Sequence, residues 1–411
     1  MGDECASKSY RKLIETRRTP ALPHECHARD TLRLRVRLES QQMNRSPGSI
    51  TGQNSNPAAG EMRERSLSCL GSCGFHRMAY TEWGDPQNPE VLVCVHGLTR
   101  NGRDFDDLAR AMSDRYRVVC PDVVGRGRSE WLRNKAAYGF PTYMADMAAL
   151  IARLDVEKVH WVGTSMGGLI GMLLASQPGT PISRMVLNDV GPVVTAVSLQ
   201  RIGPYVGTAP KFASLEAAEA YIREVSAPFG PLTDDQWQHL TRHAVRQGED
   251  GFAMVYDPAI GDAFRAAPMD EDVDLWGVYD AIACPTLVIR GAESDLLMRE
   301  TLMEMSRRGP RAEVAEIAGV GHAPMLLDET QIGIVRRFLL GCAPHRRCSR
   351  CLPRDPGRSA PRHATLSAGA AVPGRPDLPA APRGPPRLPE KGSRVRRNRR
   401  SIRVDSGGRG R

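Results

Sequence analysis

Short apolar runs alternate with helical patterns along the middle of this chain. Val91–Val95 is continuously apolar, as expected for a strand that is covered on both faces. Between such runs, apolar residues recur at the spacing of amphipathic helices, for example within 105–112. Strands that alternate with helices predict a mostly parallel sheet with helices on both faces. Further strand-like runs stand at 117–120, 159–162, 185–187, 286–289 and 311–317.

One long segment interrupts this alternation. From about 191 to 280 the pattern is helical, without a convincing strand of the main sheet. Ser214 can cap one helix of this segment, and Thr233 with Gln236 matches a capping box for another. Because loops of this length are rare inside compact domains, the segment is predicted to be a small helical cap.

The ends of the chain differ from its middle in composition. The 411 residues carry a net charge of +9, but residues 343–411 alone hold 18 Lys and Arg against 4 Asp and Glu. Residues 65–342 hold 27 basic and 35 acidic side chains, which argues against a nucleic-acid surface on this part. Residues 1–64 and 343–411 share a single aromatic residue, so we expect two disordered extensions around a domain at 65–342. The alternative for the Arg-rich stretch 394–411 is an arm that binds an acidic partner.

The sequence shows neither a membrane segment nor a metal motif. No stretch of 18 apolar residues occurs and no apolar segment follows the first charges, so we expect a cytoplasmic protein without a membrane span. Cys94, Cys120 and Cys284 lie on strand-like runs and are expected to be small buried residues. Cys348 and Cys351 form one C-x-x-C pair without a second pair at suitable spacing, so no metal or other cofactor is expected.

Candidate chemistry lies where predicted strands end, at the edge where parallel sheets bind ligands. The first such place is Gly163-Thr164-Ser165-Met166-Gly167, which follows a strand and opens a helix. A serine there stands on a tight strand-to-helix turn between glycines that leave room around it. The N–H groups and the dipole of the helix N-terminus favour developing negative charge. Ser165 is therefore the candidate nucleophile.

A second place is His96-Gly97-Leu98, directly after the strand Val91–Val95. The backbone N–H of Leu98, together with that of Met166, would form an oxyanion hole. Gly97 lets the backbone approach the substrate oxygen closely. His96 itself is expected to be structural.

The third place is a pair of residues. Asp295 follows the strand at 286–289, and His322 follows the strand at 311–317. A serine hydroxyl needs a base to take its proton, and the imidazole needs a carboxylate that fixes its tautomer. The order Ser165, Asp295, His322 meets this requirement, so we predict these residues as a catalytic triad.

Residues 70–340 resemble the α/β-hydrolase superfamily, in particular its small esterases, haloperoxidase-like enzymes and carbon–carbon bond hydrolases. The resemblance implies the α/β-hydrolase fold, with a mostly parallel central sheet and a helical cap inserted before the acid-bearing strand. Some members keep the acid where Asp189 stands here, so Asp189 is an alternative to Asp295; Glu293, two residues from Asp295, is another. The matching pieces are His96-Gly97, Pro121-Asp122, 125–129, 163–168, 285–295 and Gly321-His322.

The resemblance implies a hydrolase of a small-molecule substrate, and we expect cleavage of a carboxylic ester or related acyl bond through an acyl-enzyme. One alternative is a carbon–carbon bond hydrolase of ring-cleavage products, with Arg201 near the acid group of the substrate. Another is a ligand-binding protein on the same fold. Four aromatic residues of the segment 191–280 line a pocket or, as is commoner at helical spacing, form the core of the cap: Tyr221, Trp237, Phe264 and Trp276.

Overall fold

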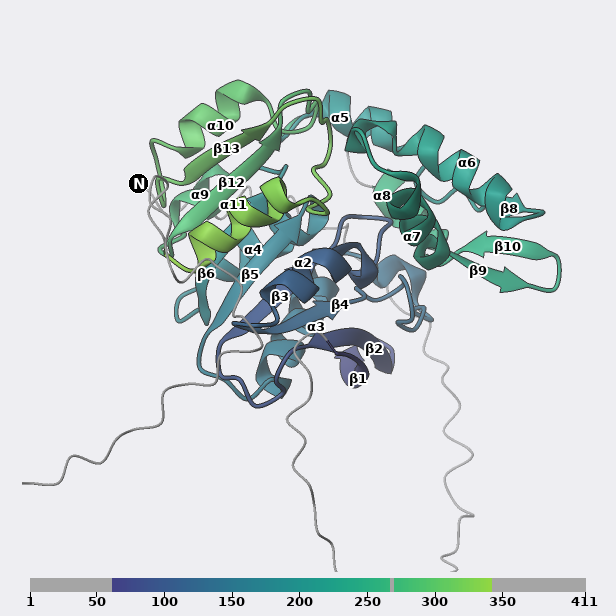
Figure 1. Ribbon diagram of the computed structural model, residues 1–411, viewed down its shortest axis with the longest axis horizontal. Coiled ribbons are helices and arrows are strands. Elements are labelled where there is room, and N and C mark those ends of the chain that lie inside the picture. The colour runs from purple at the N-terminus through teal and green to yellow at the C-terminus, as the bar shows by residue number, and fades with distance from the viewer. Residues whose placement is uncertain (1–60, 267–269, 342–411) are drawn as a thin grey trace, which may run out of the picture. The chain divides into compact units, whose positions relative to one another are not determined.

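The computed structural model describes residues 61–266 and 270–341. Its main sheet has eight strands in the order β1-β2-β4-β3-β5-β6-β12-β13 (Figure 1). The strands β4, β3, β5, β6, β12 and β13 are adjacent in the sheet and pair in parallel. β1 and β2 form an antiparallel hairpin at one edge, where β2 pairs antiparallel with β4. The predicted mostly parallel sheet is thus confirmed. The strands are β1 (Met62–Gly71), β2 (Gly74–Trp83), β3 (Val91–Val95), β4 (Arg117–Pro121), β5 (Val159–Thr164), β6 (Ile182–Asn188), β12 (Thr286–Gly291) and β13 (Glu313–Ile317).

The hairpin of β1 and β2 is the part of the sheet that the apolar pattern did not predict. β1 begins at Met62, so residues 62–64 belong to the sheet and not to an N-terminal extension. β1 is an edge strand, and only Cys69 on it is buried. Exposed edge strands tend to carry polar and charged side chains, so β1 lacks the apolar run that marks a buried strand.

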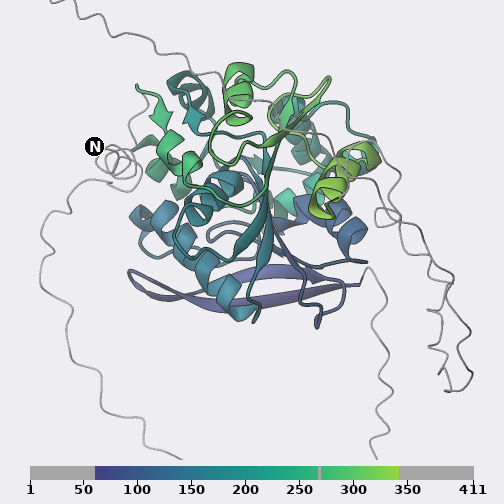
Figure 2. The ribbon, with the colours of Figure 1, turned by 90° about the vertical axis from the view of Figure 1, so that its left-hand side faces the viewer.

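Helices cover both faces of the sheet (Figures 1 and 2). Alternate residues of β3 point to opposite faces: Val91, Val93 and Val95 pack into one apolar cluster, and Leu92 and Cys94 into the other. This two-sided burial explains the continuously apolar run of β3. The first cluster includes side chains from α3 (Phe140–Arg153), α4 (Met166–Ala175), α9 (Trp276–Asp280) and α10 (Arg299–Met305), and the second from α2 (Asp106–Met112) and α11 (Glu329–Leu339).

The segment between β6 and β12, which we call the cap, contains several helices. The Ser214 hydroxyl accepts the N–H of Ala217 at the start of α6, and Thr233 and Gln236 make a reciprocal capping box at the start of α7. Trp237 lies in a separate apolar cluster of the cap. The helices of this segment up to β11 (Val273–Asp274) are α5 (Ala196–Ile202), α6 (Leu215–Val225), α7 (Asp234–Ala244) and α8 (Ala259–Arg265), and α9 follows just before β12.

The cap also contains short strands, which the helical pattern did not predict. Two of them, β7 (Val193–Val194) and β11 (Val273–Asp274), pair where the chain enters and leaves the cap. Three others form a small antiparallel sheet in the order β8-β10-β9, with bounds Lys211–Phe212, Gly251–Met254 and Val245–Gly248. Strands this short carry too few residues for a recognisable alternation. Single 3-10 turns complete the elements: η1 (Gly102–Phe105), η2 (Lys135–Ala137) and η3 (Ala227–Phe229).

Among the helices of residues 61–266 and 270–341, none combines the length and the apolar character that a membrane crossing requires. Cys94 and Cys120 are buried as expected, and Cys284 is half-buried. The predicted extensions, apart from the residues already assigned to β1, lie outside the described residues. The same holds for Cys348, Cys351 and the stretch 394–411.

Candidate active site

Ser165 stands on the turn between β5 and α4. Its φ of 51° is unusual for a residue with a side chain, and the backbone is held by a hydrogen bond from the Ser165 N–H to the carbonyl of Asn188 (3.0 Å). The chain packs tightly here: a Cβ added to Gly167 would lie 2.0 Å from the carbonyl oxygen of Val95, and one on Gly163 would lie 2.4 Å from the backbone of Gly167. Only glycine fits at these two positions, which is why the serine is flanked as it is.

The imidazole of His322 connects this serine to a carboxylate. His322 lies in the loop after β13, with Nε2 3.0 Å from Ser165 Oγ. Its Nδ1 lies 2.7 Å from Oδ2 of Asp189, the residue that follows β6. The structure therefore brings Ser165 and His322 within hydrogen-bond distance of each other.

Asp189 is fully buried and well supplied with hydrogen-bond donors. Its Oδ1 accepts the N–H of Gly291 (2.9 Å), and its Oδ2 accepts the hydroxyl of Ser294 (2.7 Å). Both donors come from the end of β12 and the loop after it. Burial of a carboxylate is costly unless such donors replace water, so the hydrogen bonds from Gly291 and Ser294 stabilise Asp189 in its buried position.

The structure corrects the predicted acid: the carboxylate on His322 belongs to Asp189 and not to Asp295. The Asp295 side chain is 54% exposed and makes two short contacts with Arg201 of the cap, at 2.6 and 2.9 Å. Ser294 and Asp295 are neighbours on one turn and point to opposite sides, so Ser294 reaches Asp189 while Asp295 faces outward. Glu293, the other alternative, is exposed.

The peptide between Gly97 and Leu98 has a defined orientation beside Ser165. The Gly97 carbonyl accepts hydrogen bonds from His96 Nδ1 (2.7 Å) and from the N–H of Arg100 (3.2 Å). In a trans peptide the N–H points opposite to the carbonyl. The Leu98 N–H therefore points away from His96 Nδ1 and the Arg100 N–H, the two groups that donate to the Gly97 carbonyl. A Cβ on Gly97 would lie 3.8 Å from Ser165 Cβ, which places this peptide next to the serine. Leu98 and Met166, the two residues predicted for the oxyanion hole, both line the cavity above Ser165.

The neutral imidazole of His96 connects the Gly97 carbonyl to the backbone N–H of Val123. Burial lowers its pKa to about 4, so the ring is uncharged near pH 7. Its Nε2 accepts the N–H of Val123 (2.9 Å), which leaves the proton on Nδ1 for the Gly97 carbonyl. The expectation that His96 is structural agrees with these contacts.

A cavity of about 810 Å³ opens above Ser165 and His322, between the sheet and the cap. Tyr221 and Phe264, two of the four aromatic residues considered for this role, line it. Trp237 instead stacks on Phe229, and Trp276 packs edge-on against a tyrosine of its own helix. Most of the other lining side chains are apolar, among them Leu98, Met166, Leu169, Val190, Val194, Leu199, Ile202, Val206, Ile222, Val225, Ile260 and Leu296.

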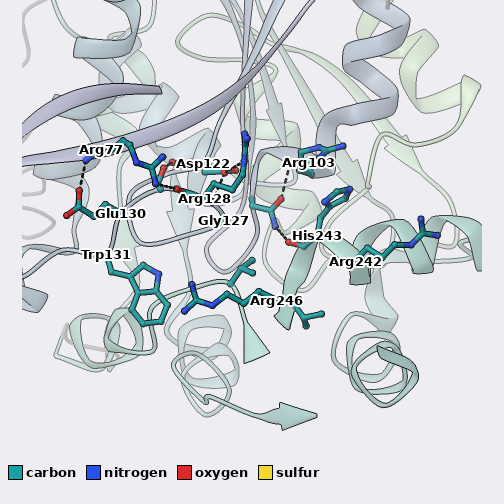
Figure 3. Close-up of a pocket in the computed structure, with 14 residues that line it drawn as sticks. Arg77, Arg103, Asp122, Gly127, Arg128, Glu130, Trp131, Arg242, His243 and Arg246 are labelled. Carbon is teal, nitrogen blue, oxygen red and sulfur yellow. Dashed lines mark hydrogen bonds and ion pairs between the residues drawn. The ribbon is translucent and has the colours of Figure 1, made fainter. Parts of the chain in front are cut away.

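A second cavity, of about 520 Å³, lies between the loop after β4 and the cap (Figure 3). Arginines and Trp131 line much of it, and the buried Asp122 forms part of its wall. The Asp122 carboxylate accepts the N–H groups of Gly102 (2.8 Å) and Arg128 (2.9 Å), and so ties the loop after β4 to η1. The lining residues of this cavity include neither Ser165 nor His322.

Within the part of the chain that the structure describes, two groups of side chains have the composition of metal ligands. Cys69, His76 and Asp146 are buried together between the hairpin and α3, and the His76 ring contacts both oxygens of Asp146, at 3.1 and 3.0 Å. Asp106, His239 and His243 form the other group, where Asp106 also pairs with an arginine. Neither group includes a residue of the Ser165 cavity lining.

Comparison with known proteins identifies the family of the chain. A family model described as the alpha/beta hydrolase family matches residues 92–332. The chain is 50% identical over 283 residues to a 3-hydroxybutyrate-oligomer hydrolase of Cupriavidus necator, over 67% of this chain and 97% of that protein. Two solved structures are also similar: a putative hydrolase from Rickettsia typhi (32% identity, 69% of this chain and 100% of that one, TM-score 0.64) and an alpha/beta hydrolase from Novosphingobium aromaticivorans (37%, 68% and 98%, TM-score 0.62).

Proposed function

The chain belongs to the alpha/beta hydrolase family, and we propose that it hydrolyses carboxylic esters with Ser165 as nucleophile, His322 as base and Asp189 as the carboxylate that orients the base. The main support for this proposal is a pair of side-chain contacts. Ser165 Oγ lies 3.0 Å from His322 Nε2, and His322 Nδ1 lies 2.7 Å from Asp189 Oδ2. Both distances are those of hydrogen bonds through which a proton can move.

In the first half of the reaction, Ser165 Oγ attacks the ester carbonyl carbon while its proton passes to His322 Nε2. The buried Asp189 stabilises the imidazolium that forms and keeps Nδ1 protonated. The N–H groups of Leu98 and Met166 donate to the negatively charged oxygen of the tetrahedral intermediate. The C–O bond of the ester then breaks, and the alcohol leaves with the proton from His322.

In the second half, water attacks the acyl group on Ser165 and gives one proton to His322 Nε2. The Ser165–acyl bond breaks, the acid leaves, and the proton returns to Ser165 Oγ. The same three side chains therefore serve both steps.

For the substrate we propose oligomeric esters of 3-hydroxybutyrate. The support is the 50% identity to a hydrolase named for this substrate, over nearly the whole length of that relative. The cavity above Ser165, with its volume of about 810 Å³ and largely apolar lining, agrees with a chain of several small ester units.

The alternatives have less support. A carbon–carbon bond hydrolase of ring-cleavage products would need an arginine near the acid group of its substrate, and the guanidinium of the candidate Arg201 is paired with Asp295. A ligand-binding protein without activity does not require the hydrogen-bonded row of Ser165, His322 and Asp189.

The test is release of 3-hydroxybutyrate from its purified dimer and trimer by the full chain, followed by chromatography. Ser165→Ala is the matched control, since it removes only the nucleophilic oxygen. We expect rapid release by the wild type and none above background by the variant. Turnover of simple p-nitrophenyl esters without release from the dimer or trimer would support the ester hydrolase and contradict the oligomer substrate. Absence of turnover on every ester would contradict both.

A further inference from the structure

Arg126 is a fully buried arginine that contacts Leu98 and Met166, and the proposed reaction gives it no role. It lies on the turn after β4 between Gly125 and Gly127, which have φ of 85° and 55°, values that favour glycine. A Cβ on Gly127 would lie 2.4 Å from the Asp122 carboxyl carbon, and Figure 3 shows Asp122, Gly127 and Arg128 together at this turn. The turn is therefore built to direct Arg126 into the interior.

The guanidinium of Arg126 contacts both residues of the proposed oxyanion hole. Its Nε donates to the carbonyl of Leu98 (2.9 Å), and its Nη2 lies 3.6 Å from the sulfur of Met166. Its Nη1 donates to the carbonyl of Val124 (2.8 Å) and the hydroxyl of Tyr143 (3.0 Å). One rigid, planar group thus joins the loop after β3 to the first residue of α4.

The charge of Arg126 has no acidic partner at hand. Among residues 61–266 and 270–341, no carboxylate forms an ion pair with it. Its neighbours are carbonyls, a sulfur, a hydroxyl and the rings of Tyr143 at 4.9 Å and Tyr138 at 5.9 Å. A buried cation without a counter-charge is costly, and its positive field persists in the low-dielectric interior. That field contributes to the lowered pKa of His96, next to Gly97.

We propose that Arg126 is a positioning residue for the oxyanion hole. Its hydrogen bond to Leu98 and its contact with Met166 hold the two N–H donors at the spacing that the tetrahedral oxyanion needs. Its charge also favours the negative oxygen that develops there. This inference rests on the proposed ester hydrolysis, and it predicts that Arg126 acts on the transition state and not on substrate binding.

The experiment compares Arg126→Met, Arg126→Lys and Arg128→Met in the full chain. Arg126→Met removes every donor and the charge at similar volume. Arg126→Lys keeps the charge, but one ammonium group cannot serve Leu98 and Met166 together. Arg128→Met is the control, because Arg128 belongs to the same turn and its side chain lies outside the Ser165 cavity, where it pairs with Glu64 (2.6 Å) and Asp122 (3.7 Å). The variant keeps the hydrogen bonds of Asp122 to the backbone N–H groups of Gly102 and Arg128.

Each variant is measured for melting temperature, for kcat and KM on a p-nitrophenyl ester, and for inhibition by a trifluoromethyl ketone and by the matching secondary alcohol. The ketone forms a tetrahedral oxyanion on Ser165, and the alcohol does not. We expect Arg126→Met to lower kcat about 10²-fold, as loss of an oxyanion donor does, with KM changed less than about threefold. Inhibition by the ketone should weaken by a similar factor, inhibition by the alcohol should not change, and Arg126→Lys should be intermediate.

Arg128→Met should behave as the wild type in each of these measurements. Folded Arg126 variants with wild-type kcat, or with equal losses for ketone and alcohol, would overturn the proposal. Failure of both Arg126 variants to fold would assign this residue to stability alone and would also overturn it. These outcomes differ from failure of the proposed function itself, in which the wild type turns over no ester.

Discussion

The ends of the neighbouring strands β6 and β12 each carry an aspartate, and the two have different surroundings. Asp189, after β6, is fully buried and contacts His322, Gly291 and Ser294. Asp295, after β12, is more than half exposed, and its contacts are with Arg201 of the cap. The two strands pair directly in parallel, so their ends lie at the same edge of the sheet.

The difference shows that a carboxylate at this edge of the sheet does not necessarily contact His322: Asp189 does, whereas Asp295 pairs with Arg201. The loop after β12 contributes to the site through Gly291 and Ser294, which donate to Asp189, while its own acid faces the cap. A buried, hydrogen-bonded carboxylate interacts strongly with a neighbouring imidazolium, whereas an exposed one is screened by water. Asp189 and Asp295 should therefore differ greatly in their effect on turnover.

We expect the largest losses of kcat at Ser165 and His322, with which the two aspartate variants can be compared. Ser165→Ala and His322→Ala should each lower kcat by about 10⁴-fold or more, because the nucleophile and its base act as a unit. For the same reason the double variant should be little worse than either single one. Ester turnover and covalent labelling by a fluorophosphonate measure this. Labelling of Ser165→Ala would show that another residue is the nucleophile.

Asp189→Asn should lower kcat by about 10³–10⁴-fold, because an amide favours the wrong tautomer of His322. Asparagine keeps the volume of the side chain, so a folded variant is expected, and circular dichroism checks this. The control is Asp295→Asn in the same assay. If Asp295→Asn reduced turnover more than Asp189→Asn, the acid assignment would be reversed.

Ser294→Ala tests whether the loop after β12 acts through Asp189. The variant removes one donor to the oxygen that also contacts His322. A hydrogen bond to a charged group contributes about 1.5 kcal/mol, which corresponds to about a tenfold loss of kcat. In an Asp189→Asn background the same change should cost much less. Equal losses in both backgrounds would show that Ser294 acts independently of Asp189.

Asp295→Asn itself should have the smallest effect. Its ion pair with Arg201 is exposed on both sides, and such pairs contribute about 1 kcal/mol or less. We expect kcat within about threefold of the wild type. Raising the salt concentration should reduce even this difference, because exposed charges are screened. A loss of kcat comparable to that of Asp189→Asn would place Asp295 in the chemistry after all.

Much of the fold could be predicted from the apolar pattern, and the exceptions have physical reasons. Strands such as β3 are covered on both faces, so every residue of Val91–Val95 is apolar and the strand can be recognised in the sequence. The edge strand β1 contacts the core mainly through Cys69, and the cap strand β7 has only two residues. Neither leaves a periodic signal in the sequence.

The sequence alone determined the parts of the site that depend on local backbone geometry. Ser165 needs a tight turn with small neighbours, and the glycines at 163 and 167 provide it within five residues. The residue that contacts His322 depends instead on side chains from three separate strand ends. Only the folded chain shows that Ser294 points inward and Asp295 outward on the same turn, because that choice is made by the contacts with Asp189 and Arg201 across the tertiary structure.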